Sequence, residues 1–162
     1  MTDAFKGWKH YEDLTRGLIK TTKAFMAMKF GDEELDQIFL DYFKPAVRET
    51  GFDLFRLNEE PKAGLIDDRL KVEIRNSKFL ISDLTHENAG AYWEAGFAEG
   101  LGKPVIYTCE KTKFDSQKTH FDTNHHLTIV WDKDCLDEAA NQLKATIRAT
   151  LPDEAKLTDD EE

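Results

Sequence analysis

The sequence predicts an α/β domain built on a doubly wound, five-stranded parallel sheet, and three observations support this. Short apolar segments alternate with segments of helical periodicity along the chain. The apolar segments are continuous, as in strands that helices cover on both faces. The chain has 162 residues, which fits one domain with a core of its own. This alternation implies parallel strands joined by right-handed crossovers.

The first strand is expected at residues 23–30, an apolar run that ends before Gly31. A helix is expected at 32–51, and Gly51 ends it. Its inward face follows helical spacing and consists of Leu35, Ile38, Phe39, Tyr42, Phe43, Ala46 and Val47. Pro45 lies inside this helix and is expected to bend or interrupt it, because proline cannot donate a backbone hydrogen bond.

The remaining elements follow by the same reasoning. They are a strand at 52–58, a helix at 66–77, a strand at 78–85, a helix within 88–104, strands at 103–108 and 127–132, and a helix at 134–151. The last helix has its apolar residues on one face, namely Leu136, Ala139, Ala140, Leu143, Ile147 and Leu151. Together these units predict a flavodoxin-like three-layer sandwich, in which ligands bind outside the carboxyl ends of the strands.

Three parts of the chain are expected: an N-terminal arm or helix at 1–22, the domain at 23–151 and an acidic tail at 152–162. Apolar residues recur three to four positions apart in the first part. A helix that lies on the domain or on a partner and a disordered arm both remain open for it. The tail holds six acidic residues and one lysine, so it is expected to be solvated and frayed.

Composition bears on the partners of the protein. The 32 acidic and 22 basic residues give a net charge of −10, which argues against nucleic-acid binding because that needs clustered Lys and Arg. No apolar run is long enough to cross a bilayer, and the N-terminus lacks the pattern of a secretory signal. The two lone thiols, Cys109 and Cys135, fit a reducing compartment. The protein is therefore expected to be cytoplasmic, with neither a nucleic-acid nor a membrane partner.

Glu94 is the carboxylate with the clearest case for a chemical role. In the helix within 88–104, its neighbours three and four residues away are glycine, alanine and phenylalanine, and none is a cation. Glu99 differs, because Lys103 follows four residues later, so Glu99 is expected at the surface. Burying an unpaired carboxylate is costly. Glu94 therefore either lines a cleft or reaches water at the edge of the helix, and both remain open.

Asp83 ends the strand at 78–85, at the carboxyl edge of the predicted sheet and near the turn that carries Glu94. Two acids beside one crevice suit glycosidic chemistry, in which one attacks and the other handles protons. Asp83 has a structural alternative, since an Asp there can accept hydrogen bonds from the following turn. Asn88 also has one, because it is placed to cap the next helix.

A metal site and a cofactor are not expected. His120, His125 and His126 lie close to Asp122, but adjacent His125 and His126 point in opposite directions if the chain is extended. The sequence contains no matching cluster of ligands elsewhere. It also lacks a dinucleotide-binding glycine motif, a phosphate loop and a hydrolase nucleophile elbow.

Two segments carry a family resemblance: "FMAMKF" and "IDDRLKVEIRNSKFLISDLTHENAGAYWEAGFAEGLGKPVI". Their most specific features are a strand-ending Asp, a turn containing Asn, an aromatic-Glu-x-Gly motif and a final Gly-Lys-Pro. In these features the chain resembles the nucleoside 2-deoxyribosyltransferase-like superfamily and its TIR-like relatives. The resemblance covers residues 23–108 well and the stretch through the fifth strand loosely.

The resemblance implies a role for each matching residue. Glu94 matches the nucleophile of the family, which attacks C1′ of a nucleoside, releases the base and holds a covalent glycosyl-enzyme. Asp83 matches an aspartate that orients groups or handles protons at the base. Asn88 stands where the best-known transferases have a sugar-binding Asp. The loop after the first strand would form a wall of the pocket, with Phe30 stacking on the base beside Gly31.

Two further residues are expected in this pocket. Gly90 would let a ligand come close to the helix, and Tyr92 is the aromatic neighbour of Glu94 expected to contact it. The resemblance thus implies an N-ribosyl transferase or hydrolase that acts on a nucleoside or nucleotide and assembles as a homo-oligomer. Two alternatives stay open, a non-catalytic nucleotide-binding sensor and a TIR-like enzyme that cleaves NAD.

Overall fold

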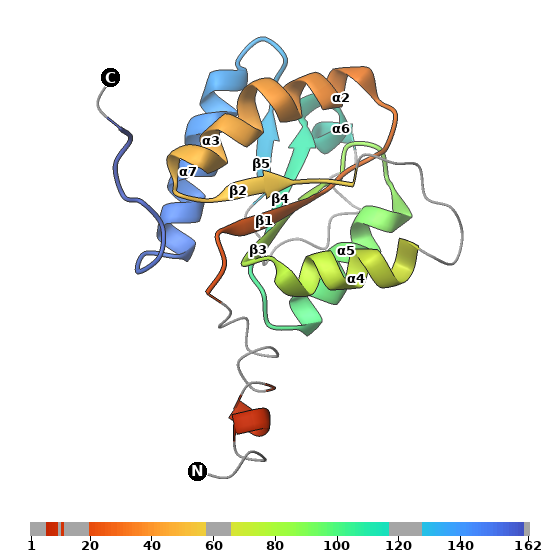
Figure 1. Ribbon diagram of the computed structural model, residues 1–162. Helices are drawn as coiled ribbons and strands as arrows, with labels where there is room; N and C mark the ends of the chain where they lie inside the picture. Colours follow the sequence, from red (N-terminus) through yellow and green to blue (C-terminus); the bar gives the residue numbers. More distant parts are fainter. Residues whose placement is uncertain (1–5, 10, 12–19, 58–65, 117–127, 161–162) are drawn as a thin grey trace.

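The computed structural model describes residues 6–9, 11, 20–57, 66–116 and 128–160. Five strands form one parallel sheet in the order β2-β1-β3-β4-β5 (Figure 1). The strands are β1 (Lys23–Ala27), β2 (Asp53–Phe55), β3 (Phe79–Asp83), β4 (Val105–Glu110) and β5 (Thr128–Trp131). This order confirms the predicted doubly wound, flavodoxin-like sheet. Its direction of winding reverses between β1 and β3, which is the switch point of the fold.

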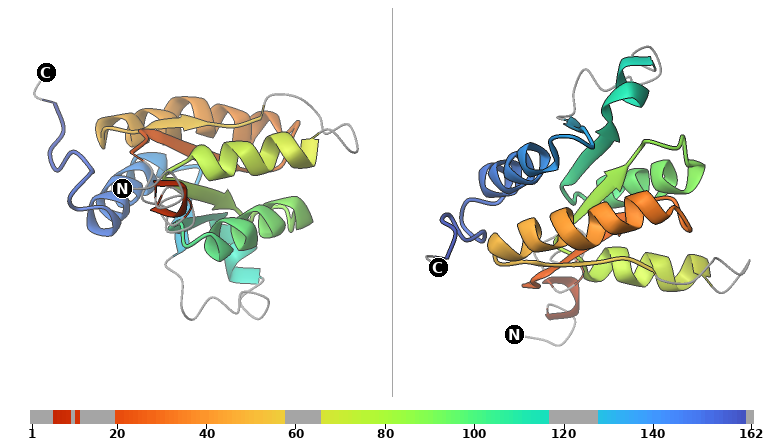
Figure 2. Two further views of the ribbon diagram at one scale, coloured as in Figure 1. Left: turned by 60° about the horizontal axis from the view of Figure 1, so that its bottom comes forward. Right: turned by 90° about the horizontal axis from the view of Figure 1, so that it is seen from above.

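Helices cover both faces of the sheet (Figure 2). One face is covered by α2 (Glu33–Ile38), η1 (Phe39–Phe43), α3 (Lys44–Glu49) and α7 (Leu136–Thr150). The other face is covered by α4 (Ile66–Asn76) and α5 (Ala89–Gly100). A short helix, α6 (Lys111–Ser116), follows β4 and was not expected from the sequence.

Alternate residues of each strand face the two helical layers. On β1, Ala24 and Met26 belong to the core beneath α2, α3 and α7, whereas Phe25 and Ala27 belong to the core beneath α4 and α5. All four are 3% exposed or less. Burial of both faces explains why the strands are continuous apolar runs in the sequence.

The helix expected at 32–51 is continuous but changes type in the middle. A π-helical segment, η1, precedes α3, which has Pro45 in its first turn. Because Pro45 has no N–H, the α-helical bond to the carbonyl of Asp41 cannot form, and the wider π turn accommodates the ring. The predicted effect of Pro45 therefore takes the form of a change of helix type in a continuous helix.

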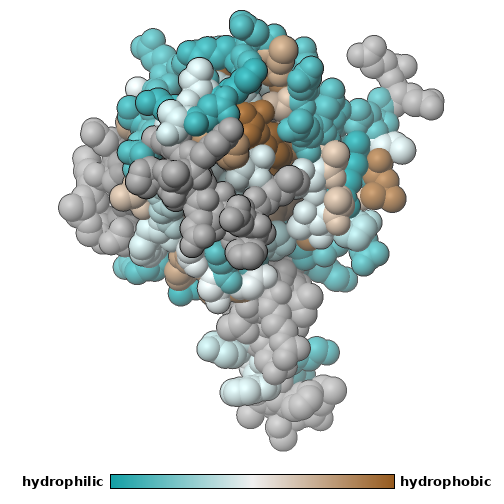
Figure 3. Space-filling view, turned by 180° about the vertical axis from the view of Figure 1, so that it is seen from behind, coloured by the Kyte–Doolittle hydropathy of each residue, from teal (hydrophilic) through white to brown (hydrophobic). Residues whose placement is uncertain are grey.

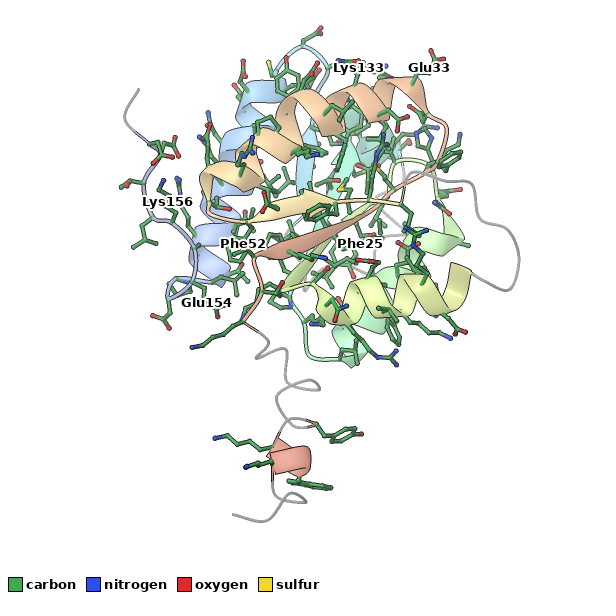
Figure 4. All side chains as sticks on the ribbon, in the orientation of Figure 1. Phe25, Glu33, Phe52, Lys133, Glu154 and Lys156 are labelled. Atoms are coloured by element: carbon green, nitrogen blue, oxygen red, sulfur yellow. The ribbon has the colours of Figure 1, made fainter. Side chains whose placement is uncertain are left out.

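The C-terminal segment 151–160 lies against the domain, so the prediction of a frayed tail is wrong for these residues. Ala155 is buried, and the backbone N–H of Lys156 donates to the carbonyl of Thr50 at 2.8 Å. Figure 4 labels Glu154 and Lys156 on this segment.

Basic side chains from distant elements pair with two acids of the segment, Glu154 and Asp159. Asp159 accepts hydrogen bonds from Lys144 at 2.7 Å and from Arg148 at 2.6 Å. Glu154 forms an ion pair with the buried Lys78 at 2.6 Å. The acidic composition of the segment alone suggested a solvated tail. It misled because the basic partners of these acids lie on other elements of the fold.

A stop after Leu151, which removes the whole segment, is expected to lower the free energy of unfolding by about 1–3 kcal/mol. Exposed ion pairs contribute up to about 1 kcal/mol each, and burial of one methyl group contributes about 0.8 kcal/mol. Urea denaturation measures the change. The control is a stop after Asp160, which removes residues 161 and 162 only. Equal stability of the two truncated chains would contradict the prediction.

Part of the predicted N-terminal arm is described. Residues 6–9 are helical, and the exposed rings of Trp8 and Tyr11 lie 6.2 Å apart. The rest of the arm up to residue 19 lies outside the described residues. Seen from behind, the described surface is largely hydrophilic, and hydrophobic residues occupy small areas (Figure 3). Within the described ranges, no helix has both the length and the apolar character that crossing a bilayer requires.

Candidate functional site

The loops after β1 and β3 leave the sheet at its carboxyl edge, on either side of the switch point (Figure 1). The first loop ends at Asp32, whose Oδ1 accepts a hydrogen bond from the N–H of Leu35 at 2.9 Å and so caps α2. The second ends at Asn88, whose Oδ1 accepts from the N–H of Gly90 at 3.0 Å and caps α5. The predicted capping role of Asn88 is confirmed. Both helices therefore begin at this edge.

Glu94 lies in the second turn of α5, and its carboxylate reaches back toward the start of the helix. A Cβ atom placed on Gly90 would stand 3.8 Å from Oε1 of Glu94 and 3.1 Å from Oδ1 of Asn88. This direction is the ordinary one, since helical side chains lean toward the N-terminus. Three of the predicted site residues, Asn88, Gly90 and Glu94, are thus brought together.

Burial sets the electrostatics of Glu94. It raises the pKa of this carboxyl to about 7, and no cation or hydrogen-bond donor of the described residues counteracts it. The expected absence of a local partner therefore holds within the described part of the chain. Glu99 on the same helix is exposed, as predicted, and accepts a hydrogen bond from the hydroxyl of Tyr107 at 2.9 Å.

Tyr92 and Glu94 point to different sides of α5. Residues two positions apart are separated by about 200° around an α-helix. Burial and the nearby Cys109 and Glu87 raise the pKa of Tyr92, and the side chain is 42% exposed. Phe97 lies on the Glu94 side, one turn on, with Arg75 of α4 at 5.3 Å from its ring. The contact of Tyr92 with a ligand stays a prediction.

Asp83 does not line a cleft, since it is 1% exposed. Its Oδ2 accepts hydrogen bonds from the hydroxyl of Thr108 at 2.7 Å and the indole N–H of Trp131 at 3.0 Å. Its Oδ1 accepts from the N–H of Thr85 at 3.1 Å. Burial raises the pKa of this carboxyl, and these hydrogen bonds oppose the rise. Asp83 therefore joins the ends of β3, β4 and β5, and its predicted pairing with Glu94 at one crevice is wrong.

Phe30 and Gly31 lie in the loop after β1, as expected. Phe30 is 47% exposed. Gly31 has a φ of 74°, in the left-handed region that favours glycine. They lie at the carboxyl edge because they come directly after β1. Their role toward a ligand stays a prediction.

Sequence reasoning missed a pair of residues that joins the two loops. Nε2 of His86 lies 2.9 Å from Oδ2 of Asp32, and both side chains are partly buried, at 27% and 21% exposure. The following residue, Glu87, has a φ of 49°, which is uncommon for a residue other than glycine. The signal that could have found the pair is position, since His86 and Asp32 each follow a strand at the carboxyl edge.

Further ion pairs connect the loops of this edge. Lys133, after β5, lies 2.6 Å from Glu34 of α2, and Lys111 of α6 lies 3.0 Å from Asp132. Figure 4 labels Lys133 close to Glu33, at the start of α2. Ion pairs therefore connect the loops of the carboxyl edge both near α2 and across the switch point.

The histidines considered as metal ligands, His120, His125 and His126, lie outside the described residues, as does Asp122. Among the residues that are described, no three His, Cys, Asp or Glu side chains are arranged to hold a metal ion. A cavity of about 330 Å³ lies between α3 and α7, lined by residues that include Glu49 and Lys144, and Glu94 is not part of it.

Comparison with known proteins assigns no family, because no protein-family model and no curated protein matches the chain. What the structure contributes is the fold, the carboxyl edge and the cluster of Asn88, Gly90 and Glu94.

Proposed function

We propose that the protein is an N-ribosyl transferase or hydrolase that acts on a nucleoside or nucleotide with Glu94 as the nucleophile. The observation that carries the proposal is the environment of Glu94. It is a partly buried carboxylate that no described donor stabilises, and it leans toward the edge where doubly wound folds bind ligands. Ionisable groups held in such costly environments cluster at functional sites.

The chemistry follows from the carboxylate and its neighbours. With a pKa of about 7, a substantial fraction of Glu94 is ionised at neutral pH. The ionised form attacks C1′ of the sugar, and the electron pair of the N-glycosidic bond leaves with the base. Water or a second base then displaces Glu94 from the ester. Asn88 uses Oδ1 in the helix cap, and its amide NH₂ remains a donor for a sugar hydroxyl.

Release of free base tests the proposal. The protein is incubated with ribonucleosides, deoxyribonucleosides, their 5′-phosphates and NAD, and the base is measured by chromatography. We expect release from at least one of them and a loss of about 10³-fold or more in Glu94→Ala, because the nucleophile is removed. Release from NAD alone would select the TIR-like alternative. Unchanged activity in Glu94→Ala would show that Glu94 is not the nucleophile.

The second candidate is a nucleotide-binding sensor without turnover, and the burial of Asp83 favours it. Retaining glycosidases use two carboxyl groups about 5–5.5 Å apart. Asp83 directs both of its oxygens into the fold and cannot act as the second. Calorimetric titration with the same compounds separates the candidates, since tight binding without release of base from any of them supports the sensor.

Gly90→Ala is expected to lower kcat/KM about tenfold or more and to change stability by less than about 1 kcal/mol. The added Cβ would crowd Oδ1 of Asn88 at 3.1 Å and Oε1 of Glu94 at 3.8 Å, where the substrate must approach. The better helix propensity of Ala, about 1 kcal/mol, offsets the crowding in the folded protein. Base release and thermal unfolding measure the two effects.

Gly96→Ala on the same helix is the matched control. A Cβ on Gly96 has no atom within 4 Å, so this change is expected to stabilise α5 and leave the kinetics unaltered. Equal kinetic losses in the two variants would contradict the role given to the space beside Gly90.

The homo-oligomer stays a prediction, and we propose that a second copy packs on the outer face of α5. Tyr92 and Trp93 are 42% and 45% exposed there, and Trp93 stacks on Phe97 with ring centroids 5.4 Å apart. Exposed apolar areas of this kind often mark association surfaces. The molar mass from light scattering is the direct test.

A further inference from the structure

Cleavage of an N-glycosidic bond needs more than a nucleophile. The departing base carries the electron pair of the broken bond, so an ordinary purine leaves easily only if a donor protonates it. Asp83 cannot be that donor, because it is 1% exposed and accepts internal hydrogen bonds at both oxygens. The proposed function therefore requires another acid at the carboxyl edge.

The loop between β3 and α5 holds His86 firmly at this edge. The N–H of Leu84 donates to the carbonyl of Thr108 at 2.9 Å, and the N–H of Glu110 donates to the hydroxyl of Thr85 at 3.0 Å. These bonds fasten the first half of the loop to β4. His86 follows directly, and the left-handed turn at Glu87 leads the chain into α5.

His86 and the carboxylate of Glu94 lie at the same end of α5. His86 precedes the N-cap residue, Asn88, by two positions. Glu94 leans back along the helix until Oε1 lies beside Gly90, in the first turn. A nucleoside bound over this end of α5 would present its sugar to Glu94 and its base to the loop that carries His86.

Asp32 orients the imidazole. Its Oδ2 lies 2.9 Å from Nε2 of His86, and its Oδ1 is held by the N–H of Leu35 at 2.9 Å. The carboxylate is thus fixed at both oxygens, and it fixes the ring in turn. Nδ1 of His86 has no hydrogen-bond partner among the described residues, and the side chain is 27% exposed. This arrangement leaves Nδ1 as the nitrogen that can exchange a proton with a ligand.

We propose that His86 is the catalytic acid and base of the reaction and that Asp32 is its positioning residue, an inference that rests on the proposed function. In the first step the proton on Nδ1 moves to a ring nitrogen of the base. At the same time the C1′–N bond breaks, its electron pair goes to the base, and an oxygen of Glu94 bonds to C1′. In the second step Nδ1 takes a proton from the water that attacks C1′, and Glu94 leaves as a carboxylate. The sum is one nucleoside and one water converted to one sugar and one free base.

A pair of substrates that differ in the leaving group tests this role. Guanosine needs a proton on its departing base, whereas N7-methylguanosine already carries the positive charge and leaves as a neutral base. His86→Gln is expected to lower kcat/KM for guanosine about 100-fold, in line with the loss of a general acid. For N7-methylguanosine we expect a change of less than about threefold. The constant kcat/KM reports the steps up to base release, so slow hydrolysis of the glycosyl-enzyme does not enter.

Two variants complete the experiment. Asp32→Asn keeps an oxygen for the α2 cap, and it is expected to reduce activity on guanosine without affecting N7-methylguanosine. Glu94→Gln is expected to lose activity on both substrates. Circular dichroism confirms that each variant is folded.

The outcomes separate the two proposals. Equal losses on both substrates in His86→Gln, or no loss on either, would overturn the role of His86 and leave Glu94 as nucleophile intact. No release of base from either nucleoside by the wild type, with none from the compounds tested above, would overturn the proposed function and the role of His86 with it.

Discussion

Replacing Glu94 by glutamine is expected to raise the free energy of unfolding by about 1–3 kcal/mol at pH 8, although it removes the proposed nucleophile. Burial raises the pKa of Glu94 from 4.5 to about 7. The folded protein therefore holds this proton more tightly than the unfolded chain does. The contribution to stability is fully present below pH 4.5 and is lost as the pH rises through 7. A full shift of this size would be worth about 3 kcal/mol, and partial exposure of the side chain reduces it.

The pH dependence identifies this effect. Thermal unfolding of wild type and Glu94→Gln is compared between pH 4.5 and 8, and the advantage of the variant is expected to grow over this range. Glu99→Gln is the control, because Glu99 is exposed and glutamine still accepts the hydrogen bond from Tyr107. A difference between wild type and Glu94→Gln that stays constant with pH would show that burial does not penalise the charge.

Asp83→Ala is expected to lower the free energy of unfolding by about 3–5 kcal/mol. The change leaves three donors inside the fold without an acceptor, namely the hydroxyl of Thr108, the indole N–H of Trp131 and the N–H of Thr85. Each unsatisfied buried donor costs about 1–3 kcal/mol, and their costs overlap. Urea denaturation followed by tryptophan fluorescence measures the loss.

Thr108→Val is the matched control for Asp83→Ala. It removes one hydrogen bond and leaves the other two, so we expect a loss of about 1 kcal/mol. Asp83→Asn decides between structure and catalysis. Its amide places a donor against either Trp131 or Thr85, and the variant is therefore expected to lose stability. Full stability with loss of turnover would restore the catalytic role that the sequence suggested.

The strands were predictable because burial on both faces demands continuous apolar residues, as in "FLISD" of β3, where all five residues are buried. The helix α6 was not, because "KTKFDS" is short, polar and without apolar periodicity. Its first turn depends on the carboxylate of Glu110, which accepts hydrogen bonds from the N–H groups of Thr112 and Lys113 at 3.0 Å each. Such a helix is stabilised by a side-chain cap and by neighbouring residues. It therefore leaves little signal in the hydrophobic pattern of the sequence.

The residues of the candidate site show the same contrast between local and long-range contacts. The environment of Glu94 could be inferred in part, because the side chains that share its helix face are three and four residues away. The environment of Asp83 could not, because its partners Thr108 and Trp131 lie 25 and 48 residues further along the chain. The contact of His86 with Asp32 likewise depends on two loops that meet only when β1 and β3 pair.

The docked C-terminal segment bears on how the protein can be attached to a surface. The segment is fastened to Thr50 and Lys78, which precede β2 and β3 at the amino edge of the sheet. Glu154 and Lys156 accordingly lie at the opposite end of the domain from Glu33 and Lys133 (Figure 4). A biotin or a linker joined after Asp160 would anchor the molecule by that end. On a biosensor chip the carboxyl edge of the sheet, toward which Glu94 leans, would then face the flowing solution, where nucleosides can reach it.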